Sequence, residues 1–186
     1  MSKAVLISIR PKWCQKIASG EKTIEVRKTR PKLETPFKCY IYCTRDKHLA
    51  FMQNASGTNL IACMDVDAAI PVGGAIGNGK VIGEFTCDRI YELAPLNHAP
   101  DDVEKQACLT REEIVNYLKG TGYGWHISDL LIYDQPRELS EFQRATDPCV
   151  FCMERIAREC TDCKKWGGDI KRAPQSWCYV DDVQAK

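Results

Sequence analysis

The sequence predicts a single domain of the α+β class, in which short strands and a few helices share one core. The chain has 186 residues, of which 44% are hydrophobic and 27% charged. That size and composition suit one well-packed core with embellishments. Short apolar runs that alternate with polar residues recur along the chain, as is typical of strands. Two other segments instead carry the start and stop signals of helices.

The first expected elements are a strand at Val5–Ile9 and a helix at Pro11–Ser19. Proline is favoured at the first position of a helix, and Gly20 permits the left-handed turn with which many helices end. The chain then returns to an alternating pattern in residues 24–27. We therefore expect a helix, a tight turn and a second strand in direct succession.

The alternation in residues 24–27 places Glu25 and Arg27 on one face of that strand, with Lys22 at its entrance. A cation, an anion and a second cation would then line one cleft. On an open strand face, the same charges would form an ordinary solvated ion-pair cluster worth under about 1 kcal/mol. The spacing thus indicates a site only if the surrounding chain encloses these side chains.

The later elements follow the same rules. Strands are expected at Cys39–Cys43, Val81–Cys87, 123–133 and Trp177–Val180, with a break at Asp134–Pro136. Leu109–Leu118 is expected to be helical, with Thr110 and Glu113 as a capping box and with Ile114, Val115 and Leu118 facing the core. Residues 45–80 form a long excursion. Its Gly74–Lys80 segment has the spacing of a phosphate-binding loop, but Val81 replaces the required Ser or Thr and a strand follows, so we expect a flexible connection.

The segment Gly-x-Lys-x-x-Glu-x-Arg at residues 20–27 resembles the signature of the ASCH (ASC-1 homology) family of the PUA-like superfamily, in its phage and bacterial type. The resemblance extends to Val5–Ile9, Val81–Cys87, 125–136 and 174–180. It implies a small β-barrel of about six strands with peripheral helices. It further implies one domain over residues 1–186, with insertions at about 45–80 and about 146–172, and a cleft associated with RNA, nucleotides or modified bases.

Two function classes follow from this resemblance. In a binding module, Lys22 and Arg27 would take a phosphate or a polar base edge, and Glu25 would orient them or accept a base amino group. Trp13 and Trp177 are candidates to stack on the base, although an aromatic residue in so small a domain can equally be core. The partner would be RNA, another single-stranded nucleic acid or a nucleoside. We favour this class.

The alternative is an enzyme. The resemblance extends to small ASCH amidohydrolases that act on N4-acylated cytidine with a lysine, a threonine and a glutamate. Lys22 matches the lysine, Glu25 stands at the threonine position, and Glu104 is the approximate counterpart of the glutamate. Other family members are credited with ribonuclease activity, in which a lysine and a carboxylate could assist phosphodiester cleavage.

The formal net charge is only +1, which argues against a surface built for long duplex DNA. Basic residues nevertheless crowd the N-terminal region, where they surround the expected cleft: Arg10, Lys12, Lys16, Lys22, Arg27, Lys28, Arg30 and Lys32. No signal peptide is recognisable, and no apolar run reaches the roughly 18 residues of a membrane span. We expect a cytoplasmic protein with no membrane partner.

The chain has 11 cysteines. Disulfides do not account for them, because the number is odd and the expected compartment keeps thiols reduced. Those in apolar runs, such as Cys39, Cys43, Cys63 and Cys87, are expected to be small core residues. Four others form two Cys-x-x-Cys pairs close together in sequence: Cys149, Cys152, Cys160 and Cys163. This spacing predicts a structural Zn²⁺ site of the knuckle type, because four thiolates saturate a tetrahedral metal. Reactive dithiols and an iron–sulfur cluster are the alternatives.

Overall fold

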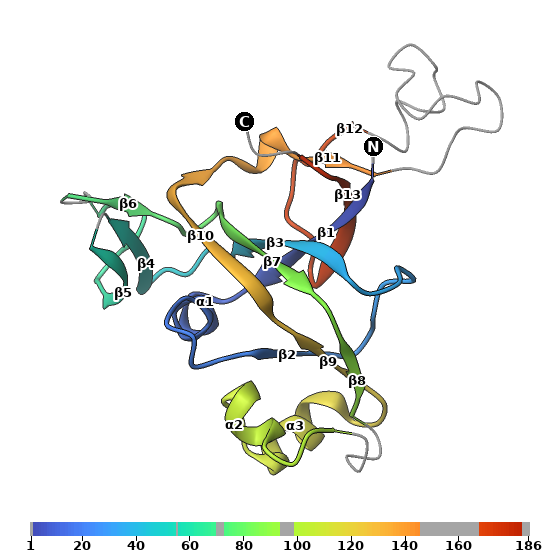
Figure 1. The fold of residues 1–186 in the computed structure, drawn as a ribbon. Helices are drawn as coiled ribbons and strands as arrows, with labels where there is room; N and C mark the ends of the chain where they lie inside the picture. The colour runs from blue at the N-terminus through green and yellow to red at the C-terminus, as the bar shows by residue number, and fades with distance from the viewer. Residues whose placement is uncertain (1, 55, 70–72, 94–98, 146–167, 184–186) are drawn as a thin grey trace, which may run out of the picture.

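The computed structural model describes residues 2–54, 56–69, 73–93, 99–145 and 168–183, and its strands form three sheets (Figure 1). The strands are β1 (Lys3–Ile9), β2 (Ile24–Arg27), β3 (Phe37–Cys43), β4 (Leu49–Asn54), β5 (Gly57–Ala62), β6 (Ala75–Ile76), β7 (Val81–Cys87), β8 (Ile90–Glu92), β9 (Tyr123–His126), β10 (Ser128–Arg137), β11 (Gln143–Arg144), β12 (Gly168–Asp169) and β13 (Trp177–Asp181). The helices are α1 (Pro11–Ala18), α2 (Val103–Ala107) and α3 (Arg111–Leu118), with a 3-10 turn, η2 (Leu139–Glu141). The predicted α+β class is confirmed.

The central sheet has seven strands in the order β10-β7-β3-β1-β13-β11-β12. β1 lies in its middle, parallel to β3 and antiparallel to β13. Residues of β1 enter two different apolar clusters: Val5 and Ile7 pack with α1 and Trp125, whereas Leu6 packs with Phe142 on the other face. A strand covered on both faces reads as a continuous apolar run, which is why β1 does not alternate in sequence.

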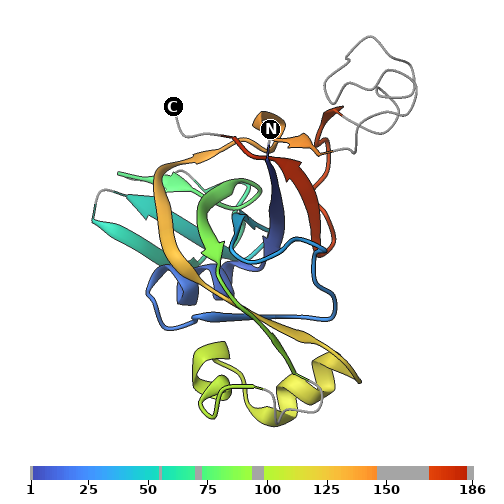
Figure 2. The same ribbon diagram turned by 45° about the vertical axis from the view of Figure 1, so that its right-hand side comes forward.

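The second sheet, β2-β9-β8, is joined to the central one by continuous chain (Figure 2). β8 follows β7 after two residues, and β10 follows β9 after Ile127. The pair β7–β10 therefore continues into the pair β8–β9 as one long ribbon, and β2 pairs with β9 in the second part of that ribbon. Among the described residues, the ladders remain three separate sheets and do not close into the single barrel of about six strands that we expected.

Asp134–Pro136 does not break β10, contrary to the sequence prediction. The strand continues to Arg137, and its ladder with β7 shifts between Ile132 and Arg137. β10 is at the edge of the central sheet. A proline is tolerated there because no neighbouring strand needs its missing N–H.

The excursion at residues 45–80 folds as a third sheet, β5-β4-β6, packed on α1. Its strands β4 and β5 form a hairpin in which Asn54 pairs with Gly57. Asn78 fixes the far end of β4, since its side chain accepts from the Phe51 amide and donates to the Leu49 carbonyl. The glycine-rich segment before β7 is more ordered than expected, because β6 lies within it and pairs with β4.

The two later helices form a layer against β2 (Figure 1). The predicted capping box of α3 is present, with Thr110 and Glu113 each bonding the other's backbone amide. Ile114 and Leu118 are buried as expected, but Val115 is 53% exposed. At 100° per residue, Val115 lies next to the buried stripe of this short helix rather than within it.

The second expected insertion leaves the fold where β11 pairs with β12. Arg144 of β11 also pairs with Val180 of β13, so the base of the insertion is attached to the central sheet. Its four metal-ligand candidates, Cys149, Cys152, Cys160 and Cys163, lie outside the described residues. The described cysteines are free thiols; Cys39, Cys43 and Cys87 are buried as expected, whereas Cys63 is partly exposed. Within the same residues, no three His, Cys, Asp or Glu side chains gather as metal ligands would.

In the part of the chain that the structure describes, no helix is long and apolar enough to span a membrane.

Candidate functional site

The turn after α1 fixes the position of Lys22. Gly20 has a φ of 76°, as predicted for the residue that ends the helix. Its amide donates to the Ile17 carbonyl, and the Lys22 amide donates to the Lys16 carbonyl at 2.9 Å. The next amide, of Thr23, bonds the Gln106 carbonyl at the end of α2. The chain therefore enters β2 with its backbone already held between two helices.

The alternation predicted for β2 is confirmed, but the strand is buried on both faces. Ile24 and Val26 pack against α2 and α3. Glu25 and Arg27 point to the opposite face, where Ser8 at the end of β1 and Ser176 before β13 approach Arg27. A solvated ion-pair cluster is thereby excluded, because these charged side chains are enclosed.

Glu25 lies between the two predicted cations. Its Oε1 is 2.9 Å from Arg27 NH2, and its Oε2 is 3.4 Å from Lys22 Nζ. The side chains of Lys22, Glu25 and Arg27 are only 2%, 9% and 9% exposed. We call these three residues the buried triad. Two cations and one anion leave it with an excess positive charge, which favours an anionic or electron-rich partner.

Backbone carbonyls hold both cations in place. Lys22 Nζ donates to the Ala107 carbonyl at 2.7 Å, at the end of α2. Arg27 NH2 donates to the Ser8 carbonyl at 2.6 Å, and NH1 donates to Ser176 Oγ at 3.3 Å. The buried triad therefore connects β2 to α2, to β1 and to the segment before β13. It contributes to the fold as well as to any binding.

A cleft of about 610 Å³ opens beside the buried triad. Trp13 of α1 lies in its wall, with its ring centroid 5.2 Å from Lys22 Nζ. The remaining lining residues come from every neighbouring element: Ser8, Ile9, Arg10, Thr44, Val26, Leu109, Glu113, Tyr117 and Gln175. Volumes of this order are typical of small-ligand sites. Four of the predicted site residues, Trp13, Lys22, Glu25 and Arg27, are thus brought together.

Tyr117 is a cleft residue that the sequence did not indicate. It lies on α3, is 44% exposed, and has Lys28 Nζ 5.4 Å from its ring centroid. The cleft therefore has one aromatic ring from α1 and another from α3. An aromatic residue beside the buried stripe of an amphipathic helix was the only signal in the sequence, and it does not distinguish a binding residue from an ordinary surface tyrosine.

Two polar atoms of the buried triad have no hydrogen-bond partner among the described residues. They are Glu25 Oε2 and Arg27 Nε. Lys22 Nζ is near Glu25 Oε2, but its 3.4 Å separation is an ion pair without hydrogen-bond geometry. Leaving such groups unsatisfied costs about 1–3 kcal/mol each, and more for charged groups. An unpaired acceptor and an unpaired donor thus lie in residues that line the cleft, and each atom has almost no exposed surface of its own.

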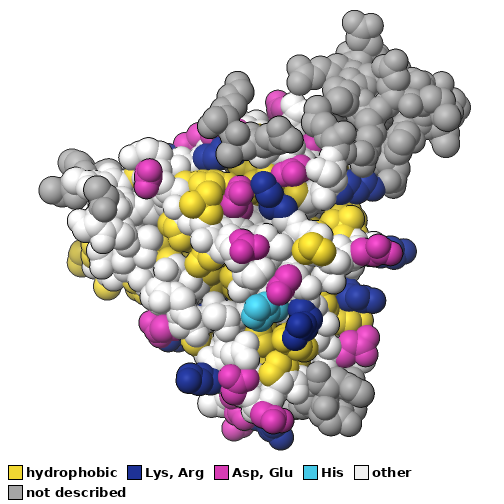
Figure 3. Space-filling view, viewed as in Figure 1, with side chains coloured by type: hydrophobic (Ala, Val, Ile, Leu, Met, Phe, Trp, Pro, Cys, Tyr) yellow, Lys and Arg dark blue, Asp and Glu magenta, His cyan; other side chains and the backbone are white. Residues whose placement is uncertain are grey.

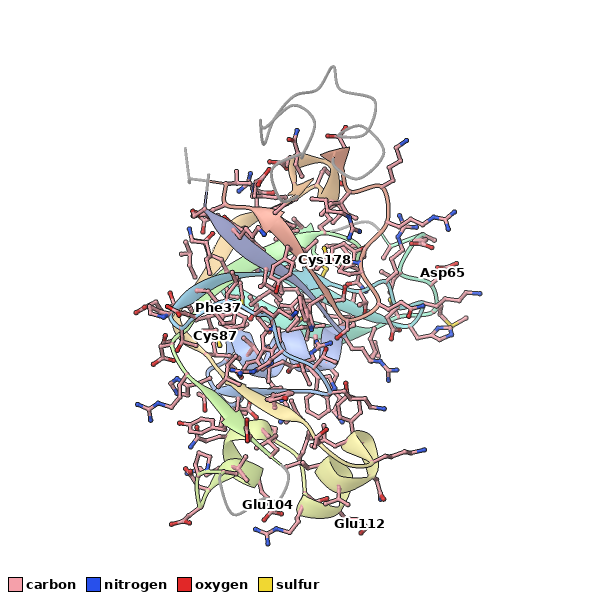
Figure 4. The ribbon with its side chains drawn as sticks, turned by 90° about the vertical axis from the view of Figure 1, so that its right-hand side faces the viewer. Phe37, Asp65, Cys87, Glu104, Glu112 and Cys178 are labelled. Carbon is pink, nitrogen blue, oxygen red and sulfur yellow. The ribbon has the colours of Figure 1, made fainter. Side chains whose placement is uncertain are left out.

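Trp177 and Glu104 are placed away from the cleft lining. Trp177 packs edge-on against Trp125 and Tyr179, and its Nε1 donates to Thr29 Oγ1 at 3.1 Å. Glu104 lies on α2 near Glu112, at the helical end of the molecule (Figure 4). Its carboxylate accepts from the Arg111 amide at 2.6 Å, at the start of α3. Trp177 therefore contributes to packing, and Glu104 satisfies a backbone amide at the start of α3.

Cys14 lies close enough to Glu25 of the buried triad to be affected by its charge, but its thiol is unsuited to act as a nucleophile. It is fully buried on α1, and its Sγ is 3.5 Å from the Ile9 carbonyl. Burial raises the pKa of the Cys14 thiol well above its ordinary value, and Cys43 and the Glu25 carboxylate raise it further. A thiol held neutral cannot attack a substrate.

The face of the molecule in Figure 3 shows lysine and arginine side chains interspersed with aspartate and glutamate. No patch of one sign covers this face. This mixture of signs agrees with the formal net charge of +1.

No model of a protein family and no curated protein matches the sequence. Two solved structures are similar to the chain over nearly its whole length. A crystal structure of a tyrosine-to-phenylalanine variant of the ASCH protein from Zymomonas mobilis has a TM-score of 0.54 at 16% identity, covering 97% of this chain and 91% of that one. A serine-to-alanine variant of the same protein has a TM-score of 0.55 at 15% identity, covering 96% and 88%. This chain therefore has the ASCH fold.

Proposed function

We propose that this protein is a binding module for nucleic acid or nucleotides, which takes a base of single-stranded RNA or a modified base into the cleft beside the buried triad. The observation that carries the proposal is the pair of unsatisfied atoms, Glu25 Oε2 and Arg27 Nε. A base edge presents N–H donors next to carbonyl or ring-nitrogen acceptors. One such edge can donate a hydrogen bond to the carboxylate and accept one from the guanidinium.

The aromatic residues of the cleft support a base over other ligands with the same polar groups. Trp13 and Tyr117 both line the cleft, and Trp13 is only partly buried. Recognition of single-stranded RNA depends on unstacked bases that lie on aromatic side chains while their edges are hydrogen-bonded. A purely anionic ligand such as a carboxylate would use the cations and leave both rings without a role.

The charges of the cleft suit the phosphate or the electron-rich carbonyl groups of a nucleotide. Arg10, Lys22 and Arg27 line it, against the carboxylates of Glu25 and Glu113. Glu113 is already engaged, because its carboxylate accepts from the Thr110 amide at 2.7 Å. Arg10 is exposed at the rim, where an unburied guanidinium can meet a phosphate that remains in water.

The hydrolase alternative has less support in the geometry. Of its three residues, Lys22 and Glu25 line the cleft, but Glu104 is bound to the start of α3 and does not. The Lys22 ammonium is also held by Glu25 and by the Ala107 carbonyl. The ammonium therefore already has two partners within the protein, and a reaction would have to redirect it toward the substrate.

Binding of a fluorescent single-stranded RNA 8-mer tests the proposal directly, with Trp13→Ala as the variant. Trp13 is outside the buried triad, so the fold should persist. Base stacking is worth about 1–3 kcal/mol, which corresponds to a loss of affinity of roughly 5- to 160-fold. Trp13→Phe should retain most of the affinity, because it keeps a ring. Failure of the unaltered protein to bind the RNA or any nucleoside, including N4-acetylcytidine, would overturn the proposal.

Incubation with N4-acetylcytidine separates binding from hydrolysis. We expect the nucleoside to be recovered intact by chromatography. Multiple turnovers to cytidine that are lost in Lys22→Ala would instead establish the enzyme class.

A further inference from the structure

A second cavity has a volume of about 440 Å³. It is lined by Tyr42, Arg45, Gly79, Glu138, Leu139, Ser140, Ile170, Lys171, Arg172 and Ala173. We call it the basic groove. Its residues come from the end of β3, the turn before β7, η2 and the segment between β12 and β13. None of the predicted binding residues belongs to it.

The basic groove and the cleft share two walls. Thr44 lines the cleft, and its neighbour Arg45 lines the groove. On the other side, Ala173 lines the groove and Gln175 the cleft. Two stretches of chain therefore contribute lining residues to both cavities, and an extended ligand that follows either stretch would reach from one cavity to the other.

Hydrogen bonds hold both shared walls on the central sheet. Ser8 Oγ donates to the Pro174 carbonyl at 2.6 Å, and the Ser8 amide donates to the Ser176 carbonyl at 2.9 Å. These bonds fasten the segment before β13 to β1, beside which it runs in Figure 1. At the other wall, the Gly79 amide donates to the Cys43 carbonyl at 2.8 Å. The groove is thus a fixed feature of the fold.

The basic groove holds three exposed cations, Arg45, Lys171 and Arg172. None of them forms a salt bridge within the described residues. The only carboxylate in the groove, Glu138, is paired with Lys80 at 2.8 Å. The groove therefore presents an uncompensated positive charge, in a protein whose overall charge is close to neutral. Uncompensated cations along a groove are the pattern by which proteins follow a phosphate backbone.

We infer that the basic groove binds the sugar–phosphate backbone of single-stranded RNA that extends from the base held in the cleft. This inference rests on the proposed function and makes its ligand an oligonucleotide and not a free nucleoside. A base that stacks on an aromatic ring of the cleft must be unstacked from its neighbours, which favours a single strand over a duplex. The adjoining phosphates then continue into the groove, where arginine and lysine meet them.

The test compares two ligands and two variants by fluorescence anisotropy over a series of salt concentrations. The ligands are a labelled single-stranded RNA 8-mer and a labelled mononucleotide. The groove variant carries Arg45→Gln, Lys171→Gln and Arg172→Gln. The control carries Lys47→Gln, Lys105→Gln and Lys119→Gln, which remove the same charge from exposed positions outside both cavities.

We expect the groove variant to bind the 8-mer with a salt dependence shallower by about 2 in log–log slope, because each phosphate contact contributes about 0.7. Its affinity for the mononucleotide should stay within about twofold of the unaltered protein, since that ligand reaches only the cleft. The control should retain most of the slope for the 8-mer.

Four results overturn the inference. One is an equal slope for the unaltered protein and the groove variant, with mononucleotide binding intact; this result leaves the proposed function standing. Another is equal competition by polyglutamate, which would show attraction of any polyanion. The third is absence of binding by both ligands, which removes the proposed function as well. The fourth is loss of 8-mer binding in the groove variant without any effect of Trp13→Ala; the groove would then bind RNA, but no base would be held in the cleft, so the proposed function and the inference would both fall.

Discussion

Replacement of Glu25 by glutamine tests whether the buried triad stabilises the fold as well as binding. Glutamine keeps the shape of the side chain but removes the only negative charge between Lys22 and Arg27. Both cations then remain enclosed, 2% and 9% exposed, with no counter-charge. A buried charge without a partner is costly because it has lost its hydration.

The magnitude follows from the geometry. At an effective dielectric constant of about 20, each of the two ion pairs has a gross attraction on the order of 5 kcal/mol. Desolvation offsets much of it, and removing one partner of a buried pair costs about 3–5 kcal/mol. We expect a loss at the lower end of this range, about 3 kcal/mol. Lys22 keeps its hydrogen bond to the Ala107 carbonyl, and Arg27 keeps its hydrogen bond to the Ser8 carbonyl. In a chain of this size, that loss lowers Tm by about 6–12 °C.

Thermal and urea unfolding, followed by circular dichroism, measure the effect. Glu21→Gln is the matched control, because Glu21 forms an ion pair with Lys16 at 2.9 Å on the surface. Glu21→Gln should have the same Tm as the unaltered protein, since water and salt screen an exposed pair. Double replacement, Glu25→Gln with Lys22→Met, should recover part of the loss because one unpaired cation is removed.

If Glu25→Gln melts together with Glu21→Gln, the reasoning is refuted. The buried triad would then be solvated in solution, and it would not stabilise the contacts of β2 with α2 and β1. High salt provides a second check. It should leave the loss nearly unchanged, because enclosed charges are screened much less than exposed ones.

Three further predictions concern other parts of the chain. Elemental analysis should find one zinc per chain, bound by Cys149, Cys152, Cys160 and Cys163. A chelator should remove the zinc without changing the β-strand signal in circular dichroism, because β11 and β12 attach that segment beside the core. A purified protein that contains no metal would contradict this prediction. Gly83→Ala should lower stability by about 1–3 kcal/mol in urea unfolding, since its Cβ would lie 2.4 Å from the Leu131 carbonyl oxygen of β10, whereas unchanged stability would show that β7 and β10 can separate. Burial opposes ionisation of Asp88, but the hydrogen bond and charge of His126, at 2.6 Å, outweigh it and hold the Asp88 pKa below its ordinary value. The gap in Tm between the unaltered protein and Asp88→Asn should therefore be present at pH 5 and shrink below about pH 4, as the carboxylate is protonated; a gap that widens in acid would reverse the assignment.

Much of the fold could be predicted from short stretches of sequence. The proline at the first position of α1, the glycine after the helix and the capping box of α3 each act within a few residues, and all three appear as expected. The alternation in β2 likewise placed Glu25 and Arg27 on one face. Pro136 was misjudged, because a proline breaks a strand only where a neighbour needs its N–H. Whether β10 has such a neighbour depends on the whole sheet.

The candidate site also combines features that follow from local sequence with features that depend on the whole fold. Turn chemistry and a period of two are local, so the charges that share a face of β2, and the place of Lys22 at its entrance, can be read from residues 20–27 alone. The enclosure of this face cannot, since Ser8, Ala107 and Ser176 reach it from distant parts of the chain. The tertiary structure also placed Tyr117 in the cleft and Trp177 against Trp125. Burial is a property of what packs on a residue, and for β2 those residues lie up to about 150 positions away in sequence.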